Sequence, residues 1–190
     1  MICPVVTAPF TSNQGQVLQD DMKKVREFSA FGKRYRCEQF SAMKGLELMG
    51  RPNNIHPCEM LSSTRVLTNI GAWADMSDDE ILNDNVIDLA HVLPPRVVLD
   101  GILSLVHDFN FAFLASWKSV KVPLRFVDGA NSVTSANVEP MASQLIQDDV
   151  ATLQQLEEYY SLEDAFKMFD TLMVKGVNLA LSQEAALKKK

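Results

Sequence analysis

The sequence predicts a mainly α protein, a helical domain with a small N-terminal β-hairpin and an extended N-terminal arm. Aromatic and β-branched residues gather on both sides of Gly32-Lys33, which indicates a hairpin. Over most of the remaining chain, apolar residues recur every three or four positions, as in amphipathic helices. The 190 residues are 47% hydrophobic and 22% charged, which suffices for one domain with a buried core.

Changes in composition divide the chain into five segments. We predict an extended arm over 1–22, a hairpin plus short helix over 23–50, a helical core over 51–118, an edge strand and loop over 119–139, and a C-terminal helical part over 140–190. The arm is rich in Pro, Thr, Ser, Asn and Gln and has no periodicity, so it is expected to be ordered only where something holds it.

The hairpin is predicted from residues 25–31 and 34–38, with the turn at Gly32-Lys33. Ser41 is the predicted N-cap of a short helix that carries Met43, Leu46 and Met49 on one face. Gly50-Arg51-Pro52 ends this helix.

The following segment is predicted to be helical throughout. A stripe of apolar and β-branched residues predicts a helix that runs toward Trp73: Met60, Thr64, Leu67 and Ile70. Ser77 and Glu80 have the spacing of a capping box and predict a second helix, with Ile81, Leu82, Val86 and Leu89 on its apolar face.

The central core helix is predicted to begin at Pro94-Pro95, because proline is favoured in the first turn of a helix. Its apolar residues recur with the spacing of a buried face: Val98, Ile102, Leu105, Phe109, Phe113 and Trp117. After it, alternating Val120, Val122, Leu124 and Phe126 predict an edge strand, with Pro123 limiting its pairing.

Two helices are predicted in the C-terminal part. The first begins at Pro140 and continues through Ile146, Val150, Leu153 and Leu156. Ser161 and Asp164 have the spacing of a cap for the final helix, whose apolar positions include Leu162, Phe169, Leu172 and Leu179. The chain ends in three lysines, whose charge suits the negative C-terminal end of a helix.

Charge and composition argue against two classes of partner. The formal net charge of -6 disfavours nucleic acid, whose phosphates require a basic surface. No apolar stretch reaches the roughly 18 to 20 residues that span a bilayer, so no membrane is expected. The first residues lack the pattern of a secretory signal, and the three cysteines suit reduced thiols in a cytosol.

No catalytic, cofactor-binding or metal site is predicted. His56-Pro57-Cys58-Glu59 places three metal-ligating residue types within four positions, but no CxxC or HxxxH spacing accompanies it. We interpret it as a loop entering a helix, with a half-buried thiol. Motifs for phosphate binding and for nucleophilic catalysis are lacking.

Two stretches are similar to a family of interaction proteins. FSAFGKRYRCEQFSAMKGLELMG (28–50) resembles the N-terminal part of tail assembly chaperones and baseplate (hub) assembly proteins of contractile-tailed bacteriophages. ATLQQLEEYYSLEDAFKMFDTLMVKGVNLALSQEAALKKK (151–190) resembles the C-terminal tails of the same proteins. This resemblance implies a non-enzymatic protein that is made in the cytoplasm of an infected bacterium and contacts other tail or baseplate proteins, such as tape-measure or hub proteins.

Three functional hypotheses follow. The first is a structural or assembly protein that stays in the tail or baseplate of the virion. The second is a tail-assembly chaperone that is absent from the mature particle, and the third is a small helical metal-dependent hydrolase that uses His56, His91 or His107. For the first two, we expect partner contacts in the arm, at the hairpin and along the final helix: Pro4, Phe10, Phe31, Lys33, Tyr35, Leu162, Phe166 and Phe169.

Overall fold

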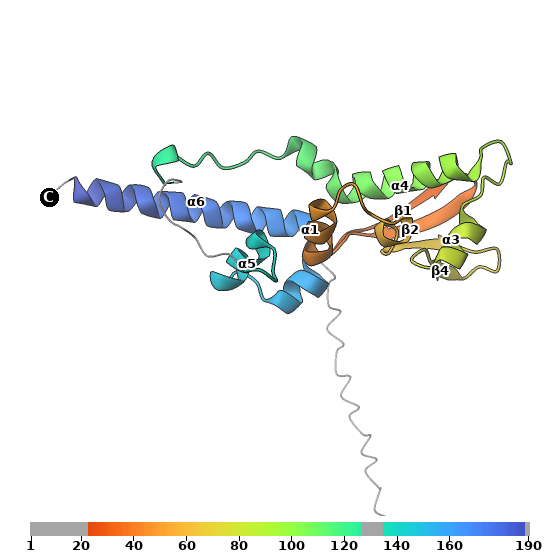
Figure 1. Ribbon diagram of the computed structural model, residues 1–190, viewed down its shortest axis with the longest axis horizontal. Coiled ribbons are helices and arrows are strands. Elements are labelled where there is room, and N and C mark those ends of the chain that lie inside the picture. The colour runs from red at the N-terminus through yellow and green to blue at the C-terminus, as the bar shows by residue number, and fades with distance from the viewer. Residues whose placement is uncertain (1–22, 127–134, 189–190) are drawn as a thin grey trace, which may run out of the picture.

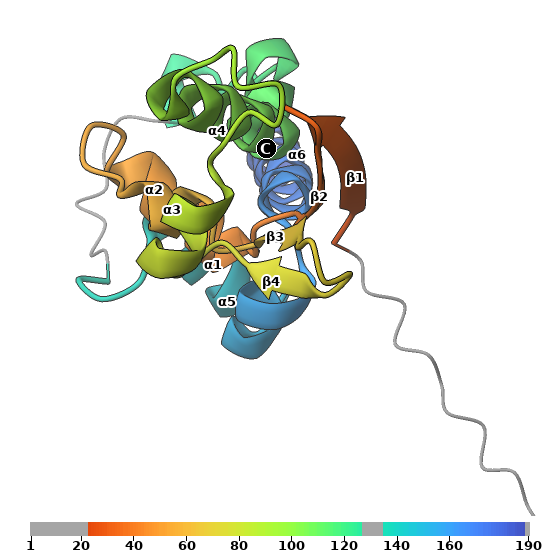
Figure 2. The same ribbon diagram turned by 90° about the vertical axis from the view of Figure 1, so that its right-hand side faces the viewer.

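The protein is elongated, with a sheet at one end and a long helix that leads away from it (Figure 1). A computed structural model describes residues 23–126 and 135–188, so the predicted arm lies outside the described residues. Viewed along the long axis, the final helix lies near the middle of the molecule, with α4 above it and α5 below it (Figure 2).

The predicted N-terminal hairpin is confirmed. Strand β1 (Val25–Ala30) pairs antiparallel with β2 (Lys33–Glu38). The turn lies one residue earlier than predicted, at Phe31 and Gly32, whose φ angles of 53° and 81° are those of a tight hairpin turn. In β2 alternate residues are buried, so one face of the hairpin belongs to the core.

The predicted fold class was wrong, because the hairpin is half of a four-stranded antiparallel sheet of order β1-β2-β3-β4. Strands β3 (Thr64–Leu67) and β4 (Trp73–Asp75) occupy the segment predicted as a helix. Residues 64 and 67 have helical spacing, but Thr64 and Val66 are buried while Arg65 is exposed, which is the alternation of a strand. The protein therefore combines α and β structure, with helices predominating.

Three short helices accompany the sheet. Helix α1 (Ala42–Gly50) begins at the predicted cap, where Ser41 Oγ accepts a hydrogen bond from the Lys44 amide. Helix α2 (Pro57–Met60) follows. Helix α3 (Asp79–Asn85) is capped by Asp78, one residue after the predicted Ser77, and ends before Val86 and Leu89.

Helix α4 (Pro95–Phe111) is the predicted core helix, and it continues into the 3₁₀ helix η1 (Ala112–Ser116). Its residues Val98, Ile102 and Val106 are fully buried. Contrary to the sequence prediction, 95–116 is long and apolar enough to cross a membrane by length and composition. Because one face of α4 packs in the core and core helices pass the same test, this is weak evidence for a membrane span.

The C-terminal part contains two corrections. The predicted edge strand is wrong for the described residues 119–126, which include the 3₁₀ helix η2 (Leu124–Phe126). The predicted continuous helix from Pro140 is instead α5 (Pro140–Gln147) followed by a π-helical turn, η3 (Gln155–Tyr159). The final helix α6 (Leu162–Leu187) is confirmed, and its Ser161–Asp164 capping box forms as predicted.

Candidate functional site

Helix α6 has a buried first part and an exposed second part. Leu162 and Ala165 are buried, and Phe166, Phe169 and Leu172 pack against the core. Beyond these residues four large apolar side chains are exposed to solvent: Val174 by 43%, Leu179 by 57%, Leu181 by 39% and Leu187 by 73%. A helix of 26 residues is about 39 Å long, so roughly the last half projects from the core.

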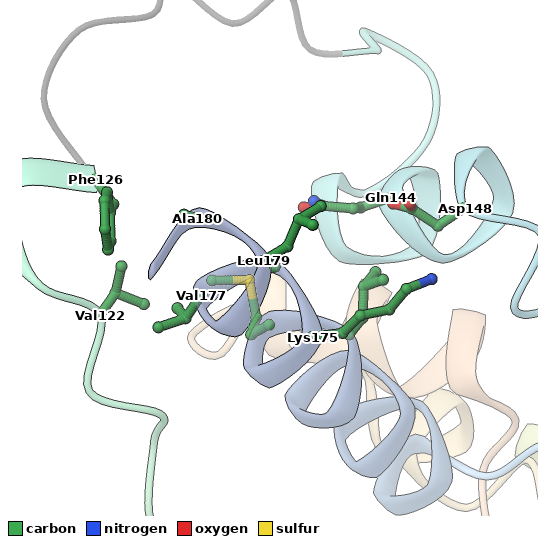
Figure 3. A pocket seen from close by; sticks show the side chains of 11 residues that line it. Val122, Phe126, Gln144, Asp148, Lys175, Val177, Leu179 and Ala180 are labelled. Carbon is green, nitrogen blue, oxygen red and sulfur yellow. The ribbon is translucent and has the colours of Figure 1, made fainter. Parts of the chain in front are cut away.

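An apolar groove accompanies this projecting part. Figure 3 shows α6 as its floor, Val122 and Phe126 on one side, and Gln144 of α5 with Asp148, the residue after this helix, on the other. Its volume is about 430 Å³, and we call it the α6 groove. Seven residues of α6 line it: Leu172, Met173, Lys175, Gly176, Val177, Leu179 and Ala180.

Gly176 lies in the middle of the α6 groove. A Cβ atom added at this position would have no atom within 4 Å except those of the neighbouring residues and backbone of α6 itself. Glycine inside a helix costs roughly 0.5–1 kcal/mol relative to alanine. Because nothing in the described chain requires a missing side chain here, the glycine leaves room for something else to approach the helix backbone.

Two smaller hollows extend the apolar surface along α6. One, of about 310 Å³, lies between Val150 and the α6 residues Met168, Thr171 and Leu172, with Lys167 and Lys175 at its border. The other, of about 200 Å³, is lined by aromatic and apolar residues on both sides: Trp117, Val120, Met141, Phe166, Phe169 and Met173. The hollows make α6 accessible over much of its length.

Aromatic contacts and an ion pair hold the segment after α4 against α6. Phe113, Trp117 and Phe166 meet edge to face, with ring centroids 5.4–5.9 Å apart. Farther along, Arg125 Nη2 lies 3.0 Å from Glu184 Oε2. Hydrogen bonds lower the pKa of the Glu184 carboxyl, the larger effect coming from Lys188 and the smaller from Arg125. This carboxylate therefore stays charged at pH values where an ordinary glutamate is already protonated. These contacts fix one wall of the α6 groove.

Positive charge borders the apolar surface. Lys167 is paired with Glu163, with an Nζ–Oε1 distance of 2.7 Å. Lys175 lines both the α6 groove and the neighbouring hollow. It forms no salt bridge with a carboxylate among residues 23–126 and 135–188. Asp148, in one wall, is the other charged residue among the described residues that line the α6 groove.

The structure buries two of the three predicted hairpin contacts, Lys33 and Tyr35. Tyr35 is fully buried, and burial raises its pKa to about 12. Lys33 is 7% exposed, and its Nζ donates to Asn85 Oδ1 at 2.9 Å. At the tip, Phe31 packs so closely on α4 that a Cβ atom on Gly101 would lie 2.6 Å from its ring. Lys33 and Tyr35 are therefore buried, which corrects the expectation that they are exposed contacts, whereas Phe31 is half-buried beside the exposed Gly32.

The other predicted contact residues have mixed outcomes. Leu162, the first residue of α6, is buried against Gly45 of α1, so it is a core residue. Phe166 and Phe169 are half-buried and line a hollow beside α6. Pro4 and Phe10 lie outside the described residues.

Sequence reasoning predicted contacts along the final helix but did not identify the groove beside its second half. Leu179 was predicted on the apolar face of the final helix, but periodicity does not tell whether that face is covered. Gly176 carried the one available signal, since a glycine inside a strongly periodic helix often has a packing or functional reason.

A second group of reactive side chains lies at the opposite end of the molecule from the tip of α6. His56, Cys58 and Asp79 each place a potential ligand atom within 4.8 Å of the other two. They are the one such group of three among the described residues, and neither His91 nor His107 belongs to it. Burial, and then the Asp79 and Asp78 carboxylates, raise the pKa of the Cys58 thiol to about 11.

Comparisons with known proteins give no relative on which to base a function. No protein-family model matches the sequence, and no curated protein or solved structure shows significant similarity to the chain.

Proposed function

We propose that this protein is a non-enzymatic assembly protein of a bacteriophage tail or baseplate, which binds an apolar helical segment of another tail component along α6. The observation that carries the proposal is the projecting part of α6, where Leu179 and Leu181 are exposed beside a groove that contains Gly176. Contiguous exposed apolar surface of this kind is characteristic of interaction sites.

The partner segment is expected to be an amphipathic helix. The α6 groove has an apolar floor and two walls, and amphipathic helices bind such grooves with one apolar face. Gly176 lets the backbone of a second helix approach closely. Lys175 and Asp148 at the border favour a helix with charged residues of both signs beside its apolar face.

The assignment to a phage tail comes from the resemblance of 28–50 and 151–190 to tail assembly chaperones and baseplate assembly proteins. The second of these stretches contains the whole of α6, so the resemblance includes the helix that provides the proposed binding surface. A tape-measure or hub protein is accordingly the partner to test first.

Whether the protein remains in the particle separates the two tail hypotheses. A structural component is present in stoichiometric amount in purified virions, whereas an assembly chaperone is absent from them. Mass spectrometry of purified particles distinguishes the two. The hydrolase hypothesis stays a prediction: of its three histidines, His56 is the one that lies beside other potential metal ligands in the described chain, namely Cys58 and Asp79.

Replacing Leu179 by aspartate is expected to weaken partner binding at least about tenfold, because a charge would be buried against the apolar face of the partner helix. The measurement is isothermal titration of the purified full chain with the tape-measure or hub protein of the same phage. Since Leu179 is 57% exposed, the free energy of unfolding of the unbound protein should change little.

Ile70→Asp is the matched control for this experiment. Ile70 is 89% exposed in the turn between β3 and β4, at the end of the molecule away from the tip of α6 (Figure 1). The control should bind with unchanged affinity. Equal binding by Leu179→Asp and Ile70→Asp would overturn the proposed site, and failure of the unaltered chain to bind any tail component would overturn the proposed function.

Gly176→Ala is expected to have opposite effects on stability and binding. The unbound protein should gain roughly 0.5–1 kcal/mol, because alanine favours the helix and its methyl group meets open space. Partner affinity should fall several-fold, because the methyl group occupies the space for the approaching helix. Chemical denaturation and isothermal titration measure the two effects, and a gain in stability with unchanged affinity would count against a close helix approach at Gly176.

A further inference from the structure

His56, Cys58 and Asp79 come together through the β3–β4 hairpin. His56 and Cys58 lie at the start of α2, and Asp79 is the first residue of α3. The β3–β4 hairpin between these helices brings the start of α3 back to the start of α2, so Cys58 and Asp79, 21 positions apart, become neighbours. Cys58 Sγ lies 2.8 Å from Asp79 Oδ1, and His56 Nδ1 lies 4.0 Å from the same oxygen.

These three side chains supply a donor set that suits zinc. Zinc binds thiolate sulfur, imidazole nitrogen and carboxylate oxygen, usually in a tetrahedron with bonds of about 2.0–2.3 Å. Atoms that share such a tetrahedron are roughly 3–4 Å apart, close to the spacing seen here. Calcium and magnesium prefer oxygen ligands alone and do not match this set.

Nearby negative charge favours a cation at this site, and two of the three ligand side chains can rotate to bind it. The side chains of His56 and Asp79 are 62% and 74% exposed, so small rotations are open to them, whereas the buried Cys58 is fixed by the core. Asp78 adds a second negative charge. Glu59, the fourth residue of the sequence cluster, is held by Lys44 and Arg51 and does not join the group.

Local structure alone gives a poor reason for the histidine. His56 is the N-cap of α2, and its Nδ1 accepts a long hydrogen bond of 3.4 Å from the Cys58 amide. Ser, Thr, Asp and Asn are the residues that cap helices well. A histidine that caps weakly yet stands beside a thiol and a carboxylate is better explained by a role as a ligand.

We propose that His56, Cys58 and Asp79 bind one zinc ion per chain, with a fourth position open to water. On binding, the thiol of Cys58 releases its proton to solvent and a sulfur–zinc bond forms in its place. The ion connects the start of α2 to the start of α3. Because folded protein provides this site and the unfolded chain does not, zinc should stabilise the fold. This site is independent of the proposed partner binding along α6.

The test uses the full chain carrying Cys3→Ser, dialysed against a chelator and then titrated with Co²⁺ and with Zn²⁺. Co²⁺ should produce a sulfur-to-metal charge-transfer band at one equivalent, and Zn²⁺ should abolish this band by displacement. Zn²⁺ should also raise the melting temperature. No charge-transfer band at stoichiometric Co²⁺ would overturn the proposal.

Variants separate this site from adventitious binding. His56→Ala and Asp79→Asn change exposed side chains and should fold normally, yet each should lower zinc affinity more than about tenfold. Cys58→Ser should remove the charge-transfer band. His107→Ala is the matched control, because His107 stands 3.6 Å from Asp108 on α4 without a cysteine, and it should bind zinc normally. Unchanged affinity in both His56→Ala and Asp79→Asn would contradict the assignment.

Discussion

Replacing Asn110 by alanine is expected to lower the free energy of unfolding by about 3 kcal/mol. Asn110 is 4% exposed and connects α4 to the end of the sheet. Its Oδ1 accepts a hydrogen bond of 2.7 Å from the amide of Phe40, and its Nδ2 donates to the Val106 carbonyl at 2.9 Å. Alanine would leave the buried Phe40 amide without a partner and would create a cavity beside it.

Urea denaturation of the two proteins measures this difference. Asn178→Ala provides the control, since Asn178 is exposed on the projecting part of α6 and should change the stability by no more than about 0.5 kcal/mol. Similar losses in the two variants would show that the Asn110 hydrogen bonds do not stabilise the fold as described.

Replacing Gly45 by alanine is expected to destabilise the protein by about 2 kcal/mol, although alanine is the better helix former. A Cβ atom at Gly45 would lie 2.8 Å from Cβ of Leu162, which is 2% exposed at the start of α6. Helix α1 cannot easily move aside, because the Ala42 amide donates to the Tyr160 carbonyl at 2.8 Å. The overpacking should therefore outweigh the gain in helix propensity.

Replacing Gly176 by alanine should stabilise the protein, so the same substitution at the two glycines should change the free energy of unfolding in opposite directions. Denaturation of Gly45→Ala, Leu162→Ala and the double variant tests the cause. Because the added methyl group collides with Leu162, the double variant should lose less stability than the sum of the single variants, by at least about 0.5 kcal/mol. Additive losses would place the strain elsewhere.

The sequence was sufficient to predict an element where residues within or next to that element determine its structure. Pro95 and the Ser161–Asp164 pair act within one turn of their own helix, and both helix starts were predicted correctly. The first hairpin was likewise predicted, because Gly32 adopts the positive φ that its turn requires.

Predictions failed where contacts with residues far away in the sequence determine the secondary structure. Thr64 and Leu67 fit helical spacing, and β2 makes that segment a strand by pairing Tyr35 with Val66. Residues 120–126 alternate like a strand, but in the structure they run beside α6, with Arg125 paired to Glu184. Single-sequence patterns contain no information about such pairings.

The candidate sites were hidden for the same reason. Asp79 lies 21 residues after Cys58, and only the β3–β4 hairpin brings the two side chains together. The final helix was predicted along its whole length, but its apolar residues do not reveal that the core buries Leu162 and leaves Leu179 exposed to solvent.

The projection of α6 beyond the core has an evolutionary consequence. Because Leu179, Leu181 and Leu187 are exposed, substitutions in the last turns should cost the fold little. Under the proposed function, natural selection could therefore alter this surface in step with the binding partner while the folded body is conserved. Among divergent descendants of this chain, residues after Leu172 should vary fastest, and a lineage that adopts a new partner should record the change there first.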